Sequence, residues 1–231
     1  MTIQTYKVGG CVRDAFLGVK SKDIDYAVEA PSYAAMKDYI LQSGGTIFLE
    51  KPEYLTIRAK LRGEDADFVM CRKDGEYTDG RRPDEVIAGT IDDDLARRDF
   101  TMNAIARRMN AKIGEDPIYD PHNGIIDIER KVIRCVGDAF DRLSEDPLRV
   151  LRAIRFSITK DFGIHPDTKA AMFVMQDRVV PTVSAERIRE ELTKCFMFDT
   201  VRTLDVLANF KSLRDDVFSN GMWLMPTLRK V

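Results

Sequence analysis

The spacing of apolar residues changes close to residue 94, and this change restricts the chain to a fold with a sheet-rich front and a helical back. Before residue 94, short apolar runs typical of strands alternate with glycine turns. After it, apolar residues recur every three or four positions, as they do along one side of an amphipathic helix. The sequence therefore predicts an α+β protein whose mixed sheet precedes an all-helical domain.

Glycine, proline and capping residues divide these two parts into individual elements. In the front part we expect strands at 3–8, 22–28, 46–49, 54–61 and 66–71, helices at 12–17 and 32–42, and a long surface loop at 72–91. In the back part we expect a helix from Asp92 or Asp93 to about residue 108, a loop with short extended pieces at 110–136, and helices at 138–143, 146–159, 166–178, 184–198 and 200–210. The predicted domains are 1–135 and 136–212, followed by a tail of undefined structure at 213–231.

Composition favours a protein of the cytoplasm. The 231 residues are 44% hydrophobic, enough for one good core or two small ones, and their net charge is only −2. The four cysteines lie far apart and only two histidines are present, so thiolate and imidazole groups form no metal-binding pattern. No apolar run approaches the roughly 20 residues that cross a bilayer, and no signal pattern opens the sequence. We expect a soluble cytoplasmic protein without a membrane partner.

The most informative local pattern is a glycine turn followed closely by two aspartates. Gly9 and Gly10 end the first predicted strand where a helix begins, a place at which backbone N–H groups favour phosphate oxygens, and Arg13 adds a positive charge. Asp23 and Asp25 lie two apart on the second predicted strand, so their side chains share a face. Two converging carboxylates repel each other unless a cation lies between them, and such hard oxygen ligands suit Mg²⁺. The pattern predicts a site for a nucleoside triphosphate and its metal.

Each part of this pattern also has a simpler interpretation. A pair of aspartates two apart is common on soluble surfaces, and two adjacent glycines are by themselves only a turn. Asp67, on a neighbouring predicted strand, is either a third carboxylate that completes a two-metal site or a solvated residue at the sheet edge. Spacing alone does not separate these two interpretations of Asp67.

Five motifs in order resemble those of one enzyme family. They lie at 9–26, 94–106, 119–137, 145–156 and 186–194, and the first contains GGCVRD followed by DIDY. With these motifs the chain resembles class II tRNA nucleotidyltransferases, which are CCA-adding enzymes, and bacterial poly(A) polymerases, members of the polymerase-β-like nucleotidyltransferase superfamily. The resemblance implies a catalytic head with a mixed sheet and a helical neck. It also implies metal binding by three acids, with two Mg²⁺ ions during turnover, and nucleotide contacts by three further residues: Asp23, Asp25 and Asp67 for the metal, and Gly10, Arg13 and Arg98 for the nucleotide.

The motif at 94–106 allows two interpretations at the residue level. The predicted helix has an apolar side that faces the core, made of Leu95, Met102, Ile105 and Ala106. This side leaves Arg97 and Arg98 available to phosphates or ribose, and Asn103 to sugar hydroxyls. Alternatively, the two arginines only form helix pairs with Asp93 and Asp94, worth a few tenths of a kcal/mol each.

The predicted helix at 146–159 has a polar stripe that suits the selection of cytosine and adenine. The stripe consists of Asp146, Arg149, Arg152 and Arg155, three residues apart. Cytosine and adenine both present an exocyclic amine beside an accepting ring nitrogen, whereas uracil and guanine present a carbonyl beside a ring N–H. Asp146 would accept from the amine and Arg149 would donate to the ring nitrogen, so the pair would reject uracil and guanine.

The simpler interpretation of this stripe is a solvated helix face without a ligand. The resemblance instead implies that Asp146 and Arg149 select the incoming base and that Arg152 and Arg155 contact the nucleotide. Poly(A) polymerases carry much the same helix, so this motif does not separate the two activities.

Two other features favour the addition of C and A to tRNA over poly(A) synthesis. The poly(A) branch usually has a basic run with a Phe and a His after the aspartate pair, and 45–58 has none. The segment 73–83 resembles the flexible loop of enzymes that add the terminal A. The expected function is the addition of CMP and AMP, from CTP and ATP, to a tRNA 3′ end with release of pyrophosphate.

Two other functions stay open at this point. One is a poly(A) polymerase or an enzyme that adds only A to another RNA, and the other is a truncated RNA- or nucleotide-binding module without catalysis. Bacterial members of the family continue beyond this length with body and tail helices that grip tRNA. We expect either tRNA binding by head and neck, with a second copy or a helper protein in place of those helices, or a smaller RNA substrate.

Overall fold

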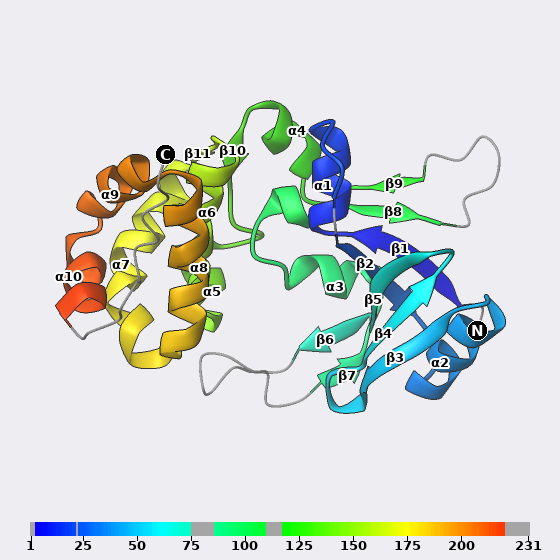
Figure 1. The fold of residues 1–231 in the computed structure, drawn as a ribbon. Coiled ribbons are helices and arrows are strands. Elements are labelled where there is room, and N and C mark those ends of the chain that lie inside the picture. Colours follow the sequence, from blue (N-terminus) through cyan, green and yellow to red (C-terminus); the bar gives the residue numbers. More distant parts are fainter. Residues whose placement is uncertain (1–2, 22, 75–85, 110–116, 220–231) are drawn as a thin grey trace, which may run out of the picture. The chain divides into compact units, whose positions relative to one another are not determined.

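Two compact units make up the chain. The computed structural model describes residues 3–21, 23–74, 86–109 and 117–219 (Figure 1). The head unit contains the described residues up to Arg130, and the neck unit contains those from Lys131 onward. The observed boundary lies between residues 130 and 131, compared with the boundary expected between 135 and 136.

A seven-stranded sheet forms the head, with the strand order β3-β4-β5-β2-β1-β8-β9. Only β2 and β5 are parallel neighbours, and the other neighbouring pairs are antiparallel, which confirms the predicted mixed sheet. The strands span β1 Gln4–Val8, β2 Ile24–Glu29, β3 Thr46–Lys51, β4 Thr56–Leu61, β5 Glu64–Met70, β8 Ala106–Arg108 and β9 Ile118–Tyr119.

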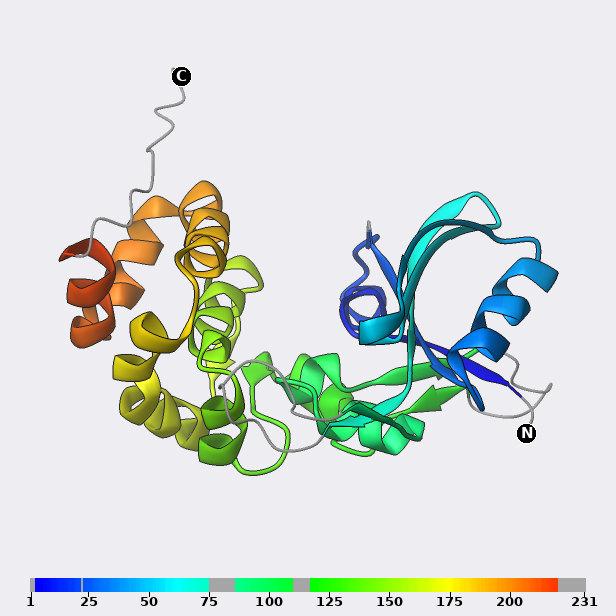
Figure 2. The same cartoon turned by 90° about the horizontal axis from the view of Figure 1, so that it is seen from below.

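Alternation along the central strands builds the main core of the head. Tyr26 of β2 and Phe68 of β5 are register partners, and their rings stack with centroids 4.8 Å apart. Helix α2, Tyr33–Gln42, lies along the same face of the sheet and buries Met36 and Ile40 against it (Figure 2). Side chains two apart on a strand share a face, so Asp25 and Asp67, each adjacent to one of these core residues, belong to the opposite face.

The helix expected from residue 92 or 93 to 108 was wrong in both its start and its length. Helix α3 covers only Ile91–Ala96 and begins with a capping box, in which Thr90 and Asp93 exchange side-chain and backbone hydrogen bonds. A 3₁₀ turn at Thr101–Asn103 follows, and then strand β8, which pairs with β1 in the sheet. Residues 106–108 are extended rather than helical because they form this strand pair. The apolar side chains of this segment are buried as expected, namely Leu95, Met102, Ile105 and Ala106.

The expected loop at 110–136 contains a helix that the sequence analysis missed. Helix α4 covers Gly124–Glu129, and the Asp120 carboxylate accepts hydrogen bonds from the N–H groups of Gly124 and Ile125 at its start. A side chain at Gly124 would meet the Thr101 carbonyl oxygen at 2.1 Å, so this close approach requires glycine.

The long loop expected at 72–91 has paired strands at its ends, β6 Arg72–Asp74 and β7 Val86–Ala88. Most of the predicted flexible loop at 73–83 lies outside the described residues.

Helices make up most of the neck, as expected. They span α5 Ala139–Glu145, α6 Leu148–Thr159, α7 Pro166–Thr182, α8 Ala185–Phe198, α9 Thr200–Ala208 and α10 Lys211–Ser219, and a short parallel pair joins β10 Val132–Ile133 to β11 Gly163–Ile164. The helix predicted at 146–159 begins at Leu148, because Asp146 has an extended backbone and Pro147 precedes the first turn. Helix α10 accounts for the first part of the expected tail, and no helix within the described ranges is long and apolar enough to cross a membrane.

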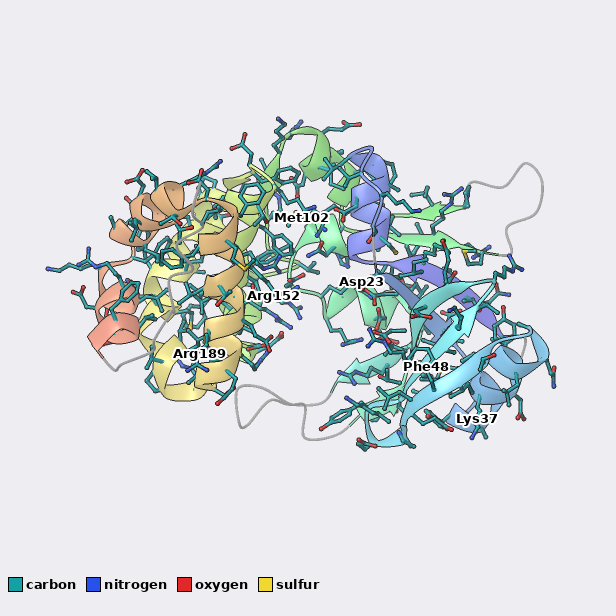
Figure 3. The ribbon with its side chains drawn as sticks, viewed as in Figure 1. Asp23, Lys37, Phe48, Met102, Arg152 and Arg189 are labelled. Carbon is teal, nitrogen blue, oxygen red and sulfur yellow. The ribbon has the colours of Figure 1, made fainter. Side chains whose placement is uncertain are left out.

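The stacked core pair gives a direct test of the head's stability. Phe68→Ala removes a fully buried ring beside Tyr26 and should lower the free energy of unfolding by about 3–5 kcal/mol. Phe48→Ala is the matched control, because Phe48 lies on the same sheet with 54% of its surface exposed (Figure 3), and it should change stability by less than about 0.5 kcal/mol. Urea denaturation measures both, and equal effects would contradict this core assignment.

Candidate functional site

Three aspartates of the head form a carboxylate cluster, defined as Asp23, Asp25 and Asp67. Asp25 on β2 and Asp67 on β5 are register partners in the parallel pair, so both project from the face opposite the stacked rings. Asp23 is exposed and lies in the bend just before β2, rather than within a strand that starts at residue 22 (Figure 3). Because β5 lies between β4 and β2, Asp67 is not a residue of the sheet edge.

The members of the carboxylate cluster interact electrostatically. Burial raises the pKa of the Asp25 carboxyl, and the charges of Asp67 and Asp23 raise it further, against the opposing effects of Arg98 and Arg58. The Arg58 guanidinium forms an ion pair with Asp67, with Nε 2.8 Å from Oδ1. Among the described residues, no group of three or more His, Cys, Asp or Glu side chains is positioned to hold a metal ion. The cluster therefore concentrates negative charge on one face of the sheet, and metal binding by it stays a prediction.

The glycine turn lies directly beside this cluster. Gly9 has φ +72° and precedes the seven-residue helix α1, Gly10–Phe16. A side chain at Gly9 would come within 2.9 Å of Arg98 Nη1 and 3.8 Å of Asp25 Oδ2. The turn therefore requires glycine both for its left-handed backbone and for the approach of Arg98 and Asp25.

A buried aspartate holds the two adjacent arginines predicted to bind nucleotide. Asp94 is 1% exposed, and its two carboxylate oxygens accept hydrogen bonds from Arg97 and Arg98, the latter with Nη2 at 2.8 Å. Burial alone would raise the pKa of Asp94, but the charges and hydrogen bonds of Arg98 and Arg97 hold that pKa below its usual value. Of the expected helix pairs, Asp94 with Arg98 is present, but Asp94 is buried and also binds Arg97, and both arginines follow the last residue of α3.

A second buried network holds Arg13 and Asn103, which the sequence analysis also assigned to the nucleotide. Arg13 is 6% exposed and donates to Asp14 Oδ1 and, through Nη1 at 2.7 Å, to Asn103 Oδ1. Asn103 in turn donates to Asp99 at 3.0 Å. The structure therefore brings these two predicted residues together inside the head, and their contact with a nucleotide stays a prediction.

In the neck, the two residues predicted to read the base have separate partners. Asp146 Oδ2 accepts from Arg187 Nη2 at 2.9 Å, whereas Arg149 Nη1 donates to Glu145 Oε2 at 2.6 Å and to the Arg142 carbonyl oxygen. Arg187 was not among the predicted site residues, although it lies in the last of the five motifs. Its sequence neighbours predict only that it lies on a helix, because its partner Asp146 is 41 residues away.

The other two arginines of the predicted stripe lie around an aromatic ring. Arg155 forms an ion pair with the buried Glu191 of α8, and its guanidinium carbon is 4.1 Å from the centroid of the Phe156 ring. The guanidinium carbon of Arg152 is 5.6 Å from the same centroid. The stripe is therefore not only a solvated helix face, because Arg155 links α6 to α8 and both arginines contact Phe156.

Comparisons with known proteins find matches along most of the chain. The model of the poly A polymerase head domain matches residues 5–134, and a model of a probable RNA and SrmB-binding site of polymerase A matches residues 161–214. The CCA-adding enzyme of Oceanobacillus iheyensis is 40% identical over 192 residues, which cover 83% of this chain and 45% of that protein.

Solved structures of CCA-adding enzymes share the fold. The Bacillus stearothermophilus CCA-adding enzyme in complex with CTP has a TM-score of 0.76 and 31% identity, over 91% of this chain and 49% of that one. The Thermotoga maritima CCA-adding enzyme complexed with tRNA has a TM-score of 0.76 and 27% identity, over 94% of this chain and 48% of that one. The chain thus spans about half the length of these relatives. Since the head-domain match covers more than half of its residues, the chain belongs to the family of class II CCA-adding enzymes and poly(A) polymerases.

Proposed function

We propose that the chain adds CMP and AMP to the 3′ end of tRNA, using CTP and ATP and releasing pyrophosphate. The observation that carries this proposal is the pairing of Asp25 with Asp67 beside the Gly9 turn and Arg98. Nucleotidyl transfer needs this combination, because carboxylates can hold cations on the face where an arginine and backbone N–H groups can receive phosphates. The relatives that bind CTP and tRNA in solved structures support the same choice of substrates.

The donor chemistry of the carboxylate cluster fits Mg²⁺. Burial raises the pKa of Asp25, two neighbouring acids raise it further, and a bound cation would relieve the repulsion among the three carboxylates. Asp23, Asp25 and Asp67 would hold the metal, and two ions would supply activation of the attacking hydroxyl and neutralisation of the phosphates. Arg98, fixed by the buried Asp94, would orient the triphosphate over the Gly9–Gly10 turn.

The neck would choose the base in this proposal. Asp146 would accept a hydrogen bond from the amine of cytosine or adenine, and Arg149 would donate to the ring nitrogen. Binding requires Arg149 to share or exchange its contacts with Glu145. The packing of Arg152 and Arg155 around Phe156 gives this surface a rigid support for nucleotide contacts.

One assay separates this function from its alternatives. The protein is incubated with Mg²⁺, tRNA lacking its 3′ end and each labelled nucleotide, and the products are sequenced. Ordered addition of C and A supports the proposal, whereas A added alone to several RNAs would indicate a poly(A)-type or A-adding enzyme. Nucleotide or RNA binding without any product would indicate a non-catalytic module.

The metal assignment is tested by Asp25→Asn. This change removes a negative oxygen from the centre of the cluster while keeping the side-chain shape, so transfer of labelled CMP should fall at least about a hundredfold. Asp65→Asn is the matched control, because Asp65 is also on β5 but its side chain is 66% exposed. Circular dichroism verifies folding of both variants, and an Asp25→Asn protein with full activity would refute the assignment.

Base selection is tested by Arg149→Ala. Loss of the guanidinium donor should reduce the preference for CTP and ATP over UTP and GTP by about tenfold, measured as ratios of kcat/KM. The rate with CTP should also fall, because Glu145 loses one of its two arginine partners. A lower rate with unchanged ratios would instead assign Arg149 a purely structural role.

A further inference from the structure

Both carboxylate oxygens of Asp146 are held from within the neck. Oδ1 accepts a hydrogen bond from the Leu148 N–H at 3.1 Å, where helix α6 begins. Oδ2 accepts from Arg187 Nη2, on helix α8, at 2.9 Å. The Asp146 side chain is 16% exposed and the Arg187 side chain 26%, so the pair is largely shielded from water. These two contacts fix the direction in which the remaining lone pairs of Asp146 point.

The other terminal nitrogen of Arg187 is in an unusual position. Nη1 is buried and has no hydrogen-bond partner within the part of the chain that the structure describes. A buried donor that has lost its water and gained no acceptor costs free energy, and such groups are rare in folded proteins. The donor lies on the same guanidinium that holds Asp146, so an acceptor atom on a ligand of Asp146 would satisfy it.

We infer that Arg187 is a specificity-determining residue of the nucleotide site, in which Nη2 holds Asp146 as an acceptor and Nη1 donates to the bound base. This inference rests on the proposed function and adds a third side chain to base selection. It is carried by the contact between Arg187 and Asp146 and by the unsatisfied Nη1 donor.

The chemistry of the bases explains why this arrangement discriminates. A carboxylate ion paired with a guanidinium only accepts hydrogen bonds, so it must face a donor on the ligand. The exocyclic amines of cytosine and adenine provide that donor, and each base also carries ring nitrogen or carbonyl acceptors for Nη1. The carbonyl of uracil or guanine would instead place lone pairs against lone pairs, which leaves buried polar groups unpaired. Without Arg187, Asp146 can turn away and so tolerate a carbonyl.

The experiment compares three variants of the whole chain. Arg187→Gln removes both the charge and the guanidinium, whereas Arg187→Lys keeps the charge beside Asp146 and loses the second donor. Arg189→Gln is the matched control, because Arg189 is exposed and lies two residues further along α8 (Figure 3). For each protein, kcat/KM is measured with CTP, ATP, UTP and GTP on tRNA lacking its 3′ end, and Kd is measured for CTP and UTP by calorimetry.

The expected result is a loss of selectivity confined to position 187. Arg187→Gln should lower the preference for CTP and ATP over UTP and GTP at least about fivefold, the lower end for one hydrogen-bonded base contact. Arg187→Lys should retain part of that preference, and Arg189→Gln all of it. The ratio of the Kd values for UTP and CTP should fall in parallel. General damage to the neck would weaken the binding of both nucleotides alike and would leave this ratio unchanged.

Unchanged ratios in a folded Arg187→Gln protein would overturn the inference. If that variant does not fold, the Arg187→Lys protein provides the test. Wild-type selectivity and wild-type CTP affinity of the Arg187→Lys protein would overturn the donor role of Nη1. Failure of the proposed function would look different, because the unaltered protein would then add neither C nor A. In that case the calorimetry still decides, since equal affinity of the unaltered protein for CTP and UTP would also refute the inference.

Discussion

The interaction on which the head depends is the ion pairing of the buried Asp94 with Arg97 and Arg98. Removing either arginine would leave a carboxylate with little solvation and half its charge compensation, which is strongly destabilising in a protein interior. The same pairing places Arg98 against the Gly9 turn and beside Asp25. The ion pair of Arg98 with Asp94 therefore also brings a positive charge to the carboxylate cluster, where Arg98 opposes the rise in the pKa of Asp25.

The sheet then resolves a conflict between stability and function. Asp25 and Asp67 repel each other across adjacent strands, and cross-strand pairs of like charge are unfavourable. The opposite face of the same two strands buries the stacked Tyr26 and Phe68, which supports this part of the sheet despite that repulsion. The neck also combines satisfied and unsatisfied polar groups. Most arginines of α6 and α8 have acidic or aromatic partners, whereas Nη1 of Arg187 has no hydrogen-bond partner among the described residues.

Local patterns predicted what depends on neighbours in the sequence. Alternation gave the central strands, and the glycine turn with its aspartates gave the residues that the structure groups around Gly9. Contacts between distant residues were beyond such patterns. The helix after Thr90 ends at Ala96, where Arg97 and Arg98 reach back to Asp94 and the following segment joins the sheet as β8, and helical spacing does not contain that information. Arg187 was missed for the same reason, since its role depends on Asp146, which lies 41 residues earlier in the sequence, between α5 and α6.

The strand order has a consequence for the growing chain on the ribosome. Strand β1 pairs with β2 soon after synthesis, but its other neighbour is β8, where Lys7 pairs with Arg107. Until that later segment emerges, one side of β1 is an open edge with unpaired N–H and C=O groups, which can join another chain. Such long-range pairing is also slow, because a large loop must close first. Helix α1 also contacts α4, so it acquires its final surroundings only when more than half of the sequence has been made.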